Sequence, residues 1–252
     1  MDDHQIALVR QAAVDGLDEA IRTWRKVGMV MDSINASMEA RAGTESNIPG
    51  HPFVTKGEPE VTEFVALVVD MRNSTDRLQN LQKFPSINSG FQRVYYETSA
   101  LLPALATTAL FEDGHVTEYL GDGALILFKV DPTDRPKTVR EAYLVADNCV
   151  TGARRVVNEL LAERFDLPNL SIGAGLSLSH AIVTLVGTPA FMQPKAIGQC
   201  VWEASKLSSG VNTVRVSDNL KKAWPSTASG TLRFDKLQDL PKKLVGFEVR
   251  KG

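Results

Sequence analysis

An apolar run that ends in a single aspartate constrains this chain more than any other feature. Residues 63–70 read Glu-Phe-Val-Ala-Leu-Val-Val-Asp and are rich in β-branched side chains. A short run of this kind predicts a buried strand. Because small polar residues follow at once, Asp70 is predicted to end the strand, where its carboxylate can face a cleft rather than the core.

A second aspartate, Asp122, lies in a Gly-Asp-Gly turn between two further strand-like runs. Each aspartate has a simpler interpretation, since Asp-Gly is a common hairpin signal and Asp70 could cap the helix that follows it. Together they indicate more, because two carboxylates on adjacent strand ends would repel each other unless a cation lay between them. Hard divalent ions such as Mg²⁺ take oxygen ligands and are usually shared with substrate phosphates. The pair therefore points to phosphoryl chemistry.

The composition argues against several other classes of protein. The 252 residues carry a net charge of −2, so the chain has no overall basic surface for nucleic acid. No apolar run approaches the ~18 residues that a membrane span needs, and the N-terminus lacks the apolar segment of a secretory signal. Cys149 and Cys200 are far apart and form no metal-like spacing. These features predict a cytoplasmic protein without a zinc site.

The N-terminal part of the chain predicts helix followed by loop. Residues 3–41 carry apolar side chains at helical spacing and predict one long amphipathic helix, or two helices broken near Gly28. This helix would pack either on its own domain or against a second copy of the chain. Residues 42–52 have the glycine, proline and polar side chains of a linker. We therefore divide the chain into an N-terminal helical segment with a linker, residues 1–55, and a domain over residues 56–252.

The rest of the chain alternates strand and helix signals in an informative order. The expected elements are a strand over 63–69, helical segments across 75–110, a hairpin at 115–128, a helix over 137–164, strands over 170–178 and 181–186, a short helix over 198–209, and strands near 213–216 and 231–249. A β-α-β-β-α-β core with extra elements is the ferredoxin-like plan, an α+β fold.

The order of these motifs resembles the catalytic domain of the class III nucleotidyl cyclases, the adenylate and guanylate cyclases. The motifs are the strand that ends in Asp70, the Gly-Asp hairpin at Asp122, the Gly-x-Gly strand at 172–175, the strand 183–187 that runs into a glycine, and the helix 197–207. The resemblance covers about residues 60–250. It implies an antiparallel-rich sheet flanked by helices, preceded here by an N-terminal helical extension.

By this resemblance, Asp70 and Asp122 would bind two divalent metal ions, Mg²⁺ or Mn²⁺, at a dimer interface. One ion would lower the pKa of the ribose 3′-hydroxyl and the other would neutralise the triphosphate. The hydroxyl would then attack the α-phosphate, and pyrophosphate would leave. The Arg72 side chain could add charge at the phosphates or could be a surface arginine. The main-chain amides that would cradle the β- and γ-phosphates are those of Met71, Arg72, Asn73, Ser74 and Thr75.

Two positions on the last helix depart from the family's usual pattern. Family members have an asparagine that orients the ribose and, four residues later, an arginine that stabilises the transition state. Trp202 and Lys206 occupy these positions here. Lysine keeps the charge without the planar fork of arginine, and it can still stabilise charge on the α-phosphate. Trp202 could stack on a base, or it could pack in the core.

Glu118 and Lys195 match the two positions that read the purine edge in the family. Adenylate cyclases have lysine and aspartate there, and guanylate cyclases have glutamate and a small polar residue or cysteine. Glu118 could accept from an amine or a ring NH, and Lys195 could donate to a carbonyl. Alternatively, the two form an ion pair that narrows the pocket. A narrowed pocket lined by tryptophan would suit a pyrimidine better than a purine.

This combination resembles the bacterial pyrimidine cyclases of the Pycsar antiphage systems, which make cyclic UMP or cyclic CMP for a separate effector protein. The resemblance implies a homodimeric cyclase for UTP or CTP. Asp70 and Asp122 of one chain would then meet Trp202 and Lys206 of the other, in two equivalent sites. Two alternatives remain open. One is a purine cyclase, with GTP favoured by Glu118, and the other is a degenerate domain that binds nucleotide without turnover.

Overall fold

The computed structural model describes residues 1–27, 43–79, 84–188, 191–225, 230–241 and 243–252. Its helices are α1 (Asp3–Val27), α2 (Ser74–Gln79), α3 (Gly90–Leu110), α4 (Arg135–Asn148), the π-helical turn η1 (Cys149–Ala153), α5 (Arg154–Phe165), α6 (Gln199–Leu207) and α7 (Asp218–Lys222). Its strands are β1 (Gly43–Ile48), β2 (His51–Thr55), β3 (Glu60–Met71), β4 (His115–Tyr119), β5 (Gly123–Lys129), β6 (Ile172–Thr188), β7 (Phe191–Gly198), β8 (Val214–Ser217), β9 (Leu232–Lys236) and β10 (Gly246–Lys251).

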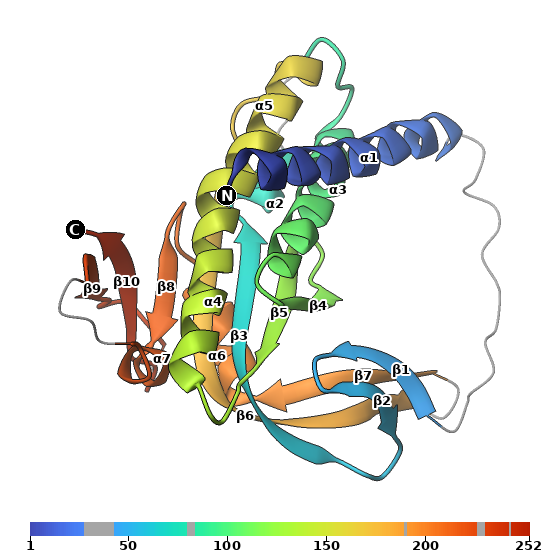
Figure 1. Cartoon of the computed structure of the whole chain (residues 1–252). Helices are drawn as coiled ribbons and strands as arrows, with labels where there is room; N and C mark the ends of the chain where they lie inside the picture. The colour runs from blue at the N-terminus through green and yellow to red at the C-terminus, as the bar shows by residue number, and fades with distance from the viewer. Residues whose placement is uncertain (28–42, 80–83, 189–190, 226–229, 242) are drawn as a thin grey trace.

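An eight-stranded sheet with helices on both faces forms the body of the molecule (Figure 1). The strand order is β4-β5-β3-β6-β8-β10-β9, and β7 pairs with the outer half of β6. The pairing of β6 with β8 is parallel, and the other pairings between the named strands are antiparallel. The α+β fold predicted from the sequence, with an antiparallel-rich sheet and an N-terminal helix, is therefore confirmed.

The two faces of β3 bury two separate hydrophobic cores, because successive side chains of a strand point to opposite faces. The odd-numbered side chains from Val65 to Met71 pack in the larger core, which α1, α3, α4 and α5 complete. The even-numbered side chains from Phe64 to Val68 pack in a smaller core with α6. Asp70 continues the even-numbered series, so its side chain lies on the face of the sheet that carries α6.

Helix α1 packs within its own chain. Val9, Ala13 and Leu17 lie on one side of the helix and are buried in the larger core. Gly16 sits so close to α3 that a Cβ atom there would be 2.3 Å from the carbonyl oxygen of Ser99. Packing on the chain itself is therefore confirmed for α1. The predicted helix beyond Val27, with its possible break near Gly28, lies outside the described residues. None of the described helices is long and apolar enough to cross a membrane.

Two local predictions are wrong. The linker expected over residues 42–52 instead contains β1, the turn and the start of β2, which pair as a hairpin. Residues 170–186 were expected to form two strands, whereas β6 is one strand of 17 residues. It stays continuous because β3 pairs with its first part and β7 with its last part. Strand β7 itself was not predicted.

Candidate active site

Asp70 lies near the end of β3, and Asp122 lies in the turn between β4 and β5, next to the residue that pairs with Asp70. Strand β3 pairs with β5 so that Asp70 is opposite Gly123, and Asp122 immediately precedes that glycine. A Cβ atom on Gly123 would be 2.5 Å from the carbonyl oxygen of Val69 and 2.9 Å from the Asp70 carboxylate. A glycine is therefore needed where the two strands bring the carboxylates together. Both aspartates are partly exposed.

Arg72 supplies a positive charge between these carboxylates. Its guanidinium donates to the Asp70 carboxylate. Burial lowers the pKa of Arg72, the nearby charge of Asp122 opposes that shift, and the charge of Arg215 adds to it. The Arg72 side chain is only 18% exposed, so the interpretation of Arg72 as a surface arginine is wrong. We call Asp70, Arg72 and Asp122 the carboxylate corner.

The carboxylate corner fits divalent metal ions. Carboxylate oxygens are the ligands that Mg²⁺ and Mn²⁺ prefer. The Arg72 guanidinium, which donates to Asp70, shows that positive charge is already held beside these carboxylates. Within the described ranges, no cluster of three or more His, Cys, Asp or Glu side chains could hold a metal ion. Substrate phosphates and water would thus have to complete the coordination, as is usual for Mg²⁺.

The chain turns sharply after Asp70, within the predicted phosphate loop. Asn73 has a φ of 59°, in the left-handed region that asparagine tolerates better than most residues. The Arg72 amide donates to the carbonyl oxygen of Ser171 at 2.8 Å, and the Met71 side chain is buried in the larger core. Ser74 and Thr75 line a cavity of about 360 Å³ that Asp122 also lines. The predicted loop residues therefore lie together beside the carboxylate corner.

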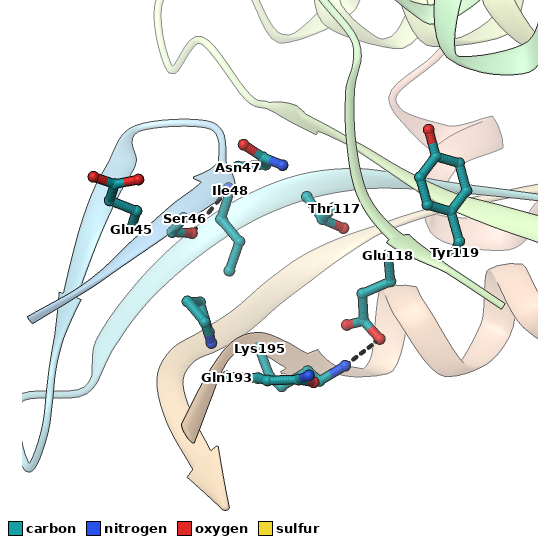
Figure 2. A pocket seen from close by; sticks show the side chains of 10 residues that line it. Glu45, Ser46, Asn47, Ile48, Thr117, Glu118, Tyr119, Gln193 and Lys195 are labelled. Carbon is teal, nitrogen blue, oxygen red and sulfur yellow. Dashed lines mark hydrogen bonds and ion pairs between the residues drawn. The ribbon is translucent and has the colours of Figure 1, made fainter. Parts of the chain in front are cut away.

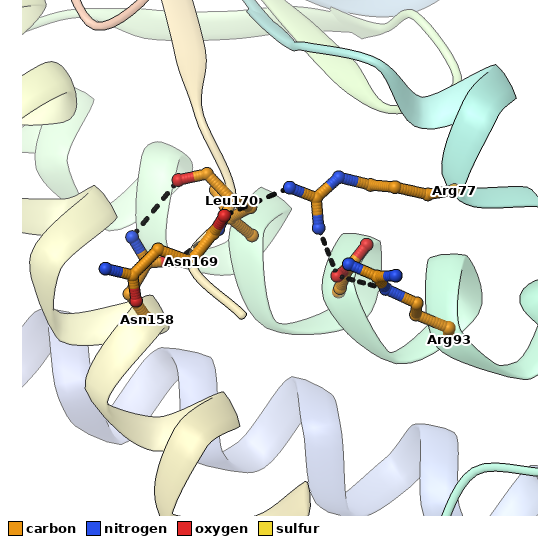
Figure 3. Close-up of polar contacts among 6 residues, drawn as sticks. Arg77, Arg93, Asn158, Asn169 and Leu170 are labelled. Carbon is orange, nitrogen blue, oxygen red and sulfur yellow. Dashed lines mark hydrogen bonds and ion pairs between the residues drawn. The ribbon is translucent and has the colours of Figure 1, made fainter. Parts of the chain in front are cut away.

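A buried ionic network holds α2, the helix that follows this loop (Figure 3). Arg77 of α2 donates to the Glu97 carboxylate of α3 at 2.7 Å and to the carbonyl oxygen of Asn169 at 3.0 Å. Arg93 donates to the same Glu97 oxygen at 3.0 Å. Glu97 is fully buried, so these contacts fix the loop relative to both α3 and the segment that leads into β6.

The Gly-x-Gly motif lets α6 lie directly on the sheet. A Cβ atom on Gly173 would be 2.1 Å from the carbonyl oxygen of Ser208, and one on Gly175 would be 2.1 Å from that of Ala204. This close contact buries one side of α6 and leaves the opposite side to solvent.

Trp202 and Lys206 lie one helical turn apart on the exposed side of α6. Trp202 is 46% exposed, so the interpretation of Trp202 as a core residue is wrong for the single chain. The buried side of the helix carries Glu203, whose carboxylate accepts hydrogen bonds from Ser177 and Gln199, each at 2.6 Å. The bond from Ser177 of β6 links the helix to the sheet, and so helps to fix its rotation and the side chains that it exposes.

Glu118 and Lys195 form the ion pair that the sequence analysis considered. Their carboxylate and ammonium groups are 2.5 Å apart, across the space between β4 and β7 (Figure 2). Both line a cavity of about 320 Å³, at the low end of the ~300–1,000 Å³ typical of ligand pockets. Glu118 pairs with Leu125 in the sheet and so shares the face that carries Asp70 and α6.

Arg215 is a candidate residue that the sequence analysis missed. It pairs with Gly175 across β8 and β6, and its side chain is only 21% exposed. It contacts Glu248 at 3.6 Å, and its charge reaches Arg72. The sequence predicts a strand near 213–216 but gives no signal for its register against β6, which is what brings Arg215 to the carboxylate corner.

Solved structures show what this architecture is similar to, whereas neither the family models nor the curated proteins include a match to the sequence. The guanylyl cyclase Cya2 is 20% identical, with a TM-score of 0.61 over 75% of this chain and 92% of that chain. The adenylyl cyclase CyaB from P. aeruginosa is 17% identical, with a TM-score of 0.62 over 77% of this chain and 97% of that chain.

A third structure, a class III adenylyl cyclase-like ATP-binding protein from Pseudomonas aeruginosa, is 19% identical. Its TM-score is 0.60, and the match covers 83% of this chain and 44% of that chain. Likeness at such low identity establishes architecture rather than activity. The chain therefore has the fold of the class III cyclase domains, as the sequence motifs predict.

Proposed function

We propose that this chain is a metal-dependent pyrimidine nucleotide cyclase that converts UTP or CTP to the 3′,5′-cyclic monophosphate and pyrophosphate. The observation that carries the proposal is the carboxylate corner, because Asp70 on β3 lies opposite Gly123, the residue next to Asp122, in a class III cyclase fold. Asp122 lines the same cavity as Ser74 and Thr75 of the predicted phosphate loop, which supports a reaction at a triphosphate.

In this proposal Asp70 and Asp122 hold two divalent ions, Mg²⁺ or Mn²⁺. When bound, the ions make the ribose 3′-hydroxyl more acidic and neutralise charge on the triphosphate. The amides of residues 71–75 bind the β- and γ-phosphates, and the charges of Arg72 and Arg215 attract them. Lys206 stabilises the charge that grows on the α-phosphate, and Trp202 stacks on the base.

The proposal requires a homodimer. Trp202 and Lys206 point into solvent in the single chain, so they can reach a substrate held by the carboxylate corner of a second copy. A two-fold interface would make two equivalent sites. Large apolar side chains are exposed nearby on the β4–β5 turn and on β7, as an interface between copies would need: Tyr119, Leu120, Phe191 and Ile197.

The choice of a pyrimidine rests on Glu118 and Lys195. The pair replaces the lysine and aspartate that read adenine, and it lines a small cavity. The resemblance to the Pycsar cyclases adds the wider proposal that a cytoplasmic enzyme makes cyclic UMP or cyclic CMP for a separate effector protein in antiphage defence.

Two other functions have observations in their favour. The matching structures include guanylyl and adenylyl cyclases, which favours a purine cyclase. One is a class III adenylyl cyclase-like ATP-binding protein, and the asparagine and arginine of the last helix are replaced here. Both observations favour a domain that binds nucleotide without turnover. The two adjacent carboxylates argue against this last function, because binding without chemistry has no need of them.

The test is to incubate the purified chain separately with ATP, GTP, CTP and UTP in the presence of Mn²⁺ and to separate the products by chromatography. Cyclic UMP or cyclic CMP supports the proposal and identifies the base. A cyclic purine nucleotide supports the purine cyclase instead. Nucleotide binding in calorimetry without release of pyrophosphate supports the domain without turnover.

A further inference from the structure

We infer that the β1–β2 hairpin forms one wall of the base pocket and that Asn47 is a substrate-binding residue that holds the edge of the nucleobase. This inference deepens the proposed cyclase function and depends on it. It concerns residues 43–55, which lie before the part of the chain that carries the cyclase motifs.

The hairpin is a fixed part of the structure. Ile48 and Val54 are each only 4% exposed and pack in the smaller core with Phe64 of β3. His51 is buried, and its Nε2 lies 2.8 Å from the hydroxyl of Thr62. The hairpin is thus held by apolar side chains in the smaller core and by a polar contact with β3. Its remaining side chains can therefore take up a defined geometry.

These remaining side chains line the same cavity as the Glu118–Lys195 ion pair. Ser46 and Asn47 stand on the hairpin side, and Thr117 and Glu118 on the β4 side. Figure 2 shows the Asn47 amide projecting from β1 toward β4, with the ion pair on the far side of the space. Segments far apart in the sequence thus form a single pocket of about 320 Å³.

Asn47 is the polar group best able to bind a ligand here. Its amide makes no hydrogen bond with any residue in the described part of the chain, and the residue is exposed to the pocket. Glu118 and Lys195 already satisfy each other at 2.5 Å, so a base that bound to them alone would have to break an ion pair. The Ser46 hydroxyl already accepts a hydrogen bond from the Ile48 amide at 3.0 Å.

The chemistry of an amide matches the edge of a nucleobase. Asn47 offers NH₂ donors beside a carbonyl acceptor. Uracil presents an acceptor beside a ring NH, and cytosine presents a ring acceptor beside an amine, so either edge can pair with the amide in one of its two orientations. Asn47 would therefore contribute affinity for the base, and the neighbouring Glu118–Lys195 pair would set which base is preferred.

The test measures binding to the full-length chain by calorimetry with Mn²⁺. The probes are the α,β-methylene analogues of the four nucleoside triphosphates, which cannot release pyrophosphate, and tripolyphosphate, which has no base. For Asn47→Ala we expect the Kd of the preferred analogue to rise about tenfold, the loss of roughly one good hydrogen bond. The Kd of tripolyphosphate should stay within about twofold of wild type.

Asn88→Ala is a matched control, because Asn88 is also exposed and does not line the pocket. It should leave every Kd unchanged, and the melting temperature of Asn47→Ala should equal that of wild type. Equal affinity of wild type and Asn47→Ala for the preferred analogue overturns this inference. If the wild type still makes a cyclic nucleotide, the proposed function survives that result. A wild-type chain that neither binds nor cyclises any nucleotide overturns both.

Discussion

The carboxylate corner and the base pocket differ in how the chain builds them. The corner arises where one buried strand ends beside a tight turn, so that Asp70 and Asp122 are fixed by the pairing of β3 with β5. The pocket joins β1, β4 and β7, three segments from distant parts of the sequence. We infer that the chemistry depends on one strand pairing beside a tight turn, and that base selection depends on a surface assembled from three distant segments.

Loss of either carboxylate should have the largest effect on turnover. It should also show most clearly how the carboxylate corner differs in role from the base pocket. Asp70→Ala and Asp122→Ala should each lower turnover by roughly a thousandfold or more, because each would remove a proposed ligand of the charge-stabilising ions. Both side chains are partly exposed, so the melting temperature should change little. Chromatography of the products and thermal unfolding measure the two quantities. Near wild-type turnover in either variant would contradict the assignment of the corner.

Disruption of the ionic network of Arg77, Arg93 and Glu97 should have the largest effect on the free energy of unfolding. Glu97→Ala leaves Arg77 and Arg93 without their shared buried carboxylate, and breaking a buried ion pair in this way costs about 3–5 kcal/mol. Chemical denaturation measures the loss. Glu163→Ala is the matched control, since its 2.6 Å pair with Arg10 lies on the surface and should contribute less than about 1 kcal/mol. Equal losses in the two variants would show that the network does not anchor α2.

The contact between α6 and the sheet can be tested at the Gly-x-Gly motif. Gly175→Ala would place a Cβ atom 2.1 Å from the Ala204 carbonyl oxygen, and overpacking of this kind costs about 1–3 kcal/mol. Turnover should fall as well, because the helix that carries Trp202 and Lys206 must shift. Denaturation and product assays measure the two effects.

Gly57→Ala is the control for the effect of a new methyl group. Gly57 has a φ of 81° but no atom within 4 Å of a Cβ position, so this variant adds backbone strain of about 1 kcal/mol without a clash. It should leave turnover unchanged. Normal turnover in Gly175→Ala would show that the position of α6 is not critical to the reaction.

The sequence predicts the corner well and the pocket poorly, for physical reasons. A run of β-branched residues determines β3 locally, and Gly123 marks the turn, so Asp70 and Asp122 could be placed before any tertiary contact was known. Residues 42–52 have the composition of a loop. Residues 43–55 nevertheless form a strand pair, because Ile48 and Val54 pack in the smaller core. Such long-range packing leaves no local signal.

The position of Arg215 was unpredictable for the same reason. Its strand was expected, but only the parallel register of β8 against β6 places Arg215 opposite Gly175 and near Arg72. Glu118 and Lys195 were named from motif positions, whereas their direct contact depends on β7, a strand that the sequence analysis did not predict. The residues proposed to select the base are therefore harder to identify from the sequence than the proposed metal ligands.

The smallest effect on the free energy of unfolding is expected at the Glu118–Lys195 ion pair of the base pocket. This ion pair also gives the most direct test of the difference between the carboxylate corner and the base pocket. The double variant Glu118→Lys with Lys195→Asp recreates the lysine and aspartate of the adenylate cyclases while keeping opposite charges in contact. The pair is partly exposed, so its exchange should change the free energy of unfolding by less than about 1 kcal/mol. Product assays with all four nucleotides should show the ratio of ATP to pyrimidine turnover rising about tenfold, the equivalent of 1.4 kcal/mol.

If the ratio stays unchanged while turnover persists, the ion pair does not set the choice of base. Selection must then lie in other groups of the pocket, because the proposed function assigns only the phosphates and the ribose to the carboxylate corner.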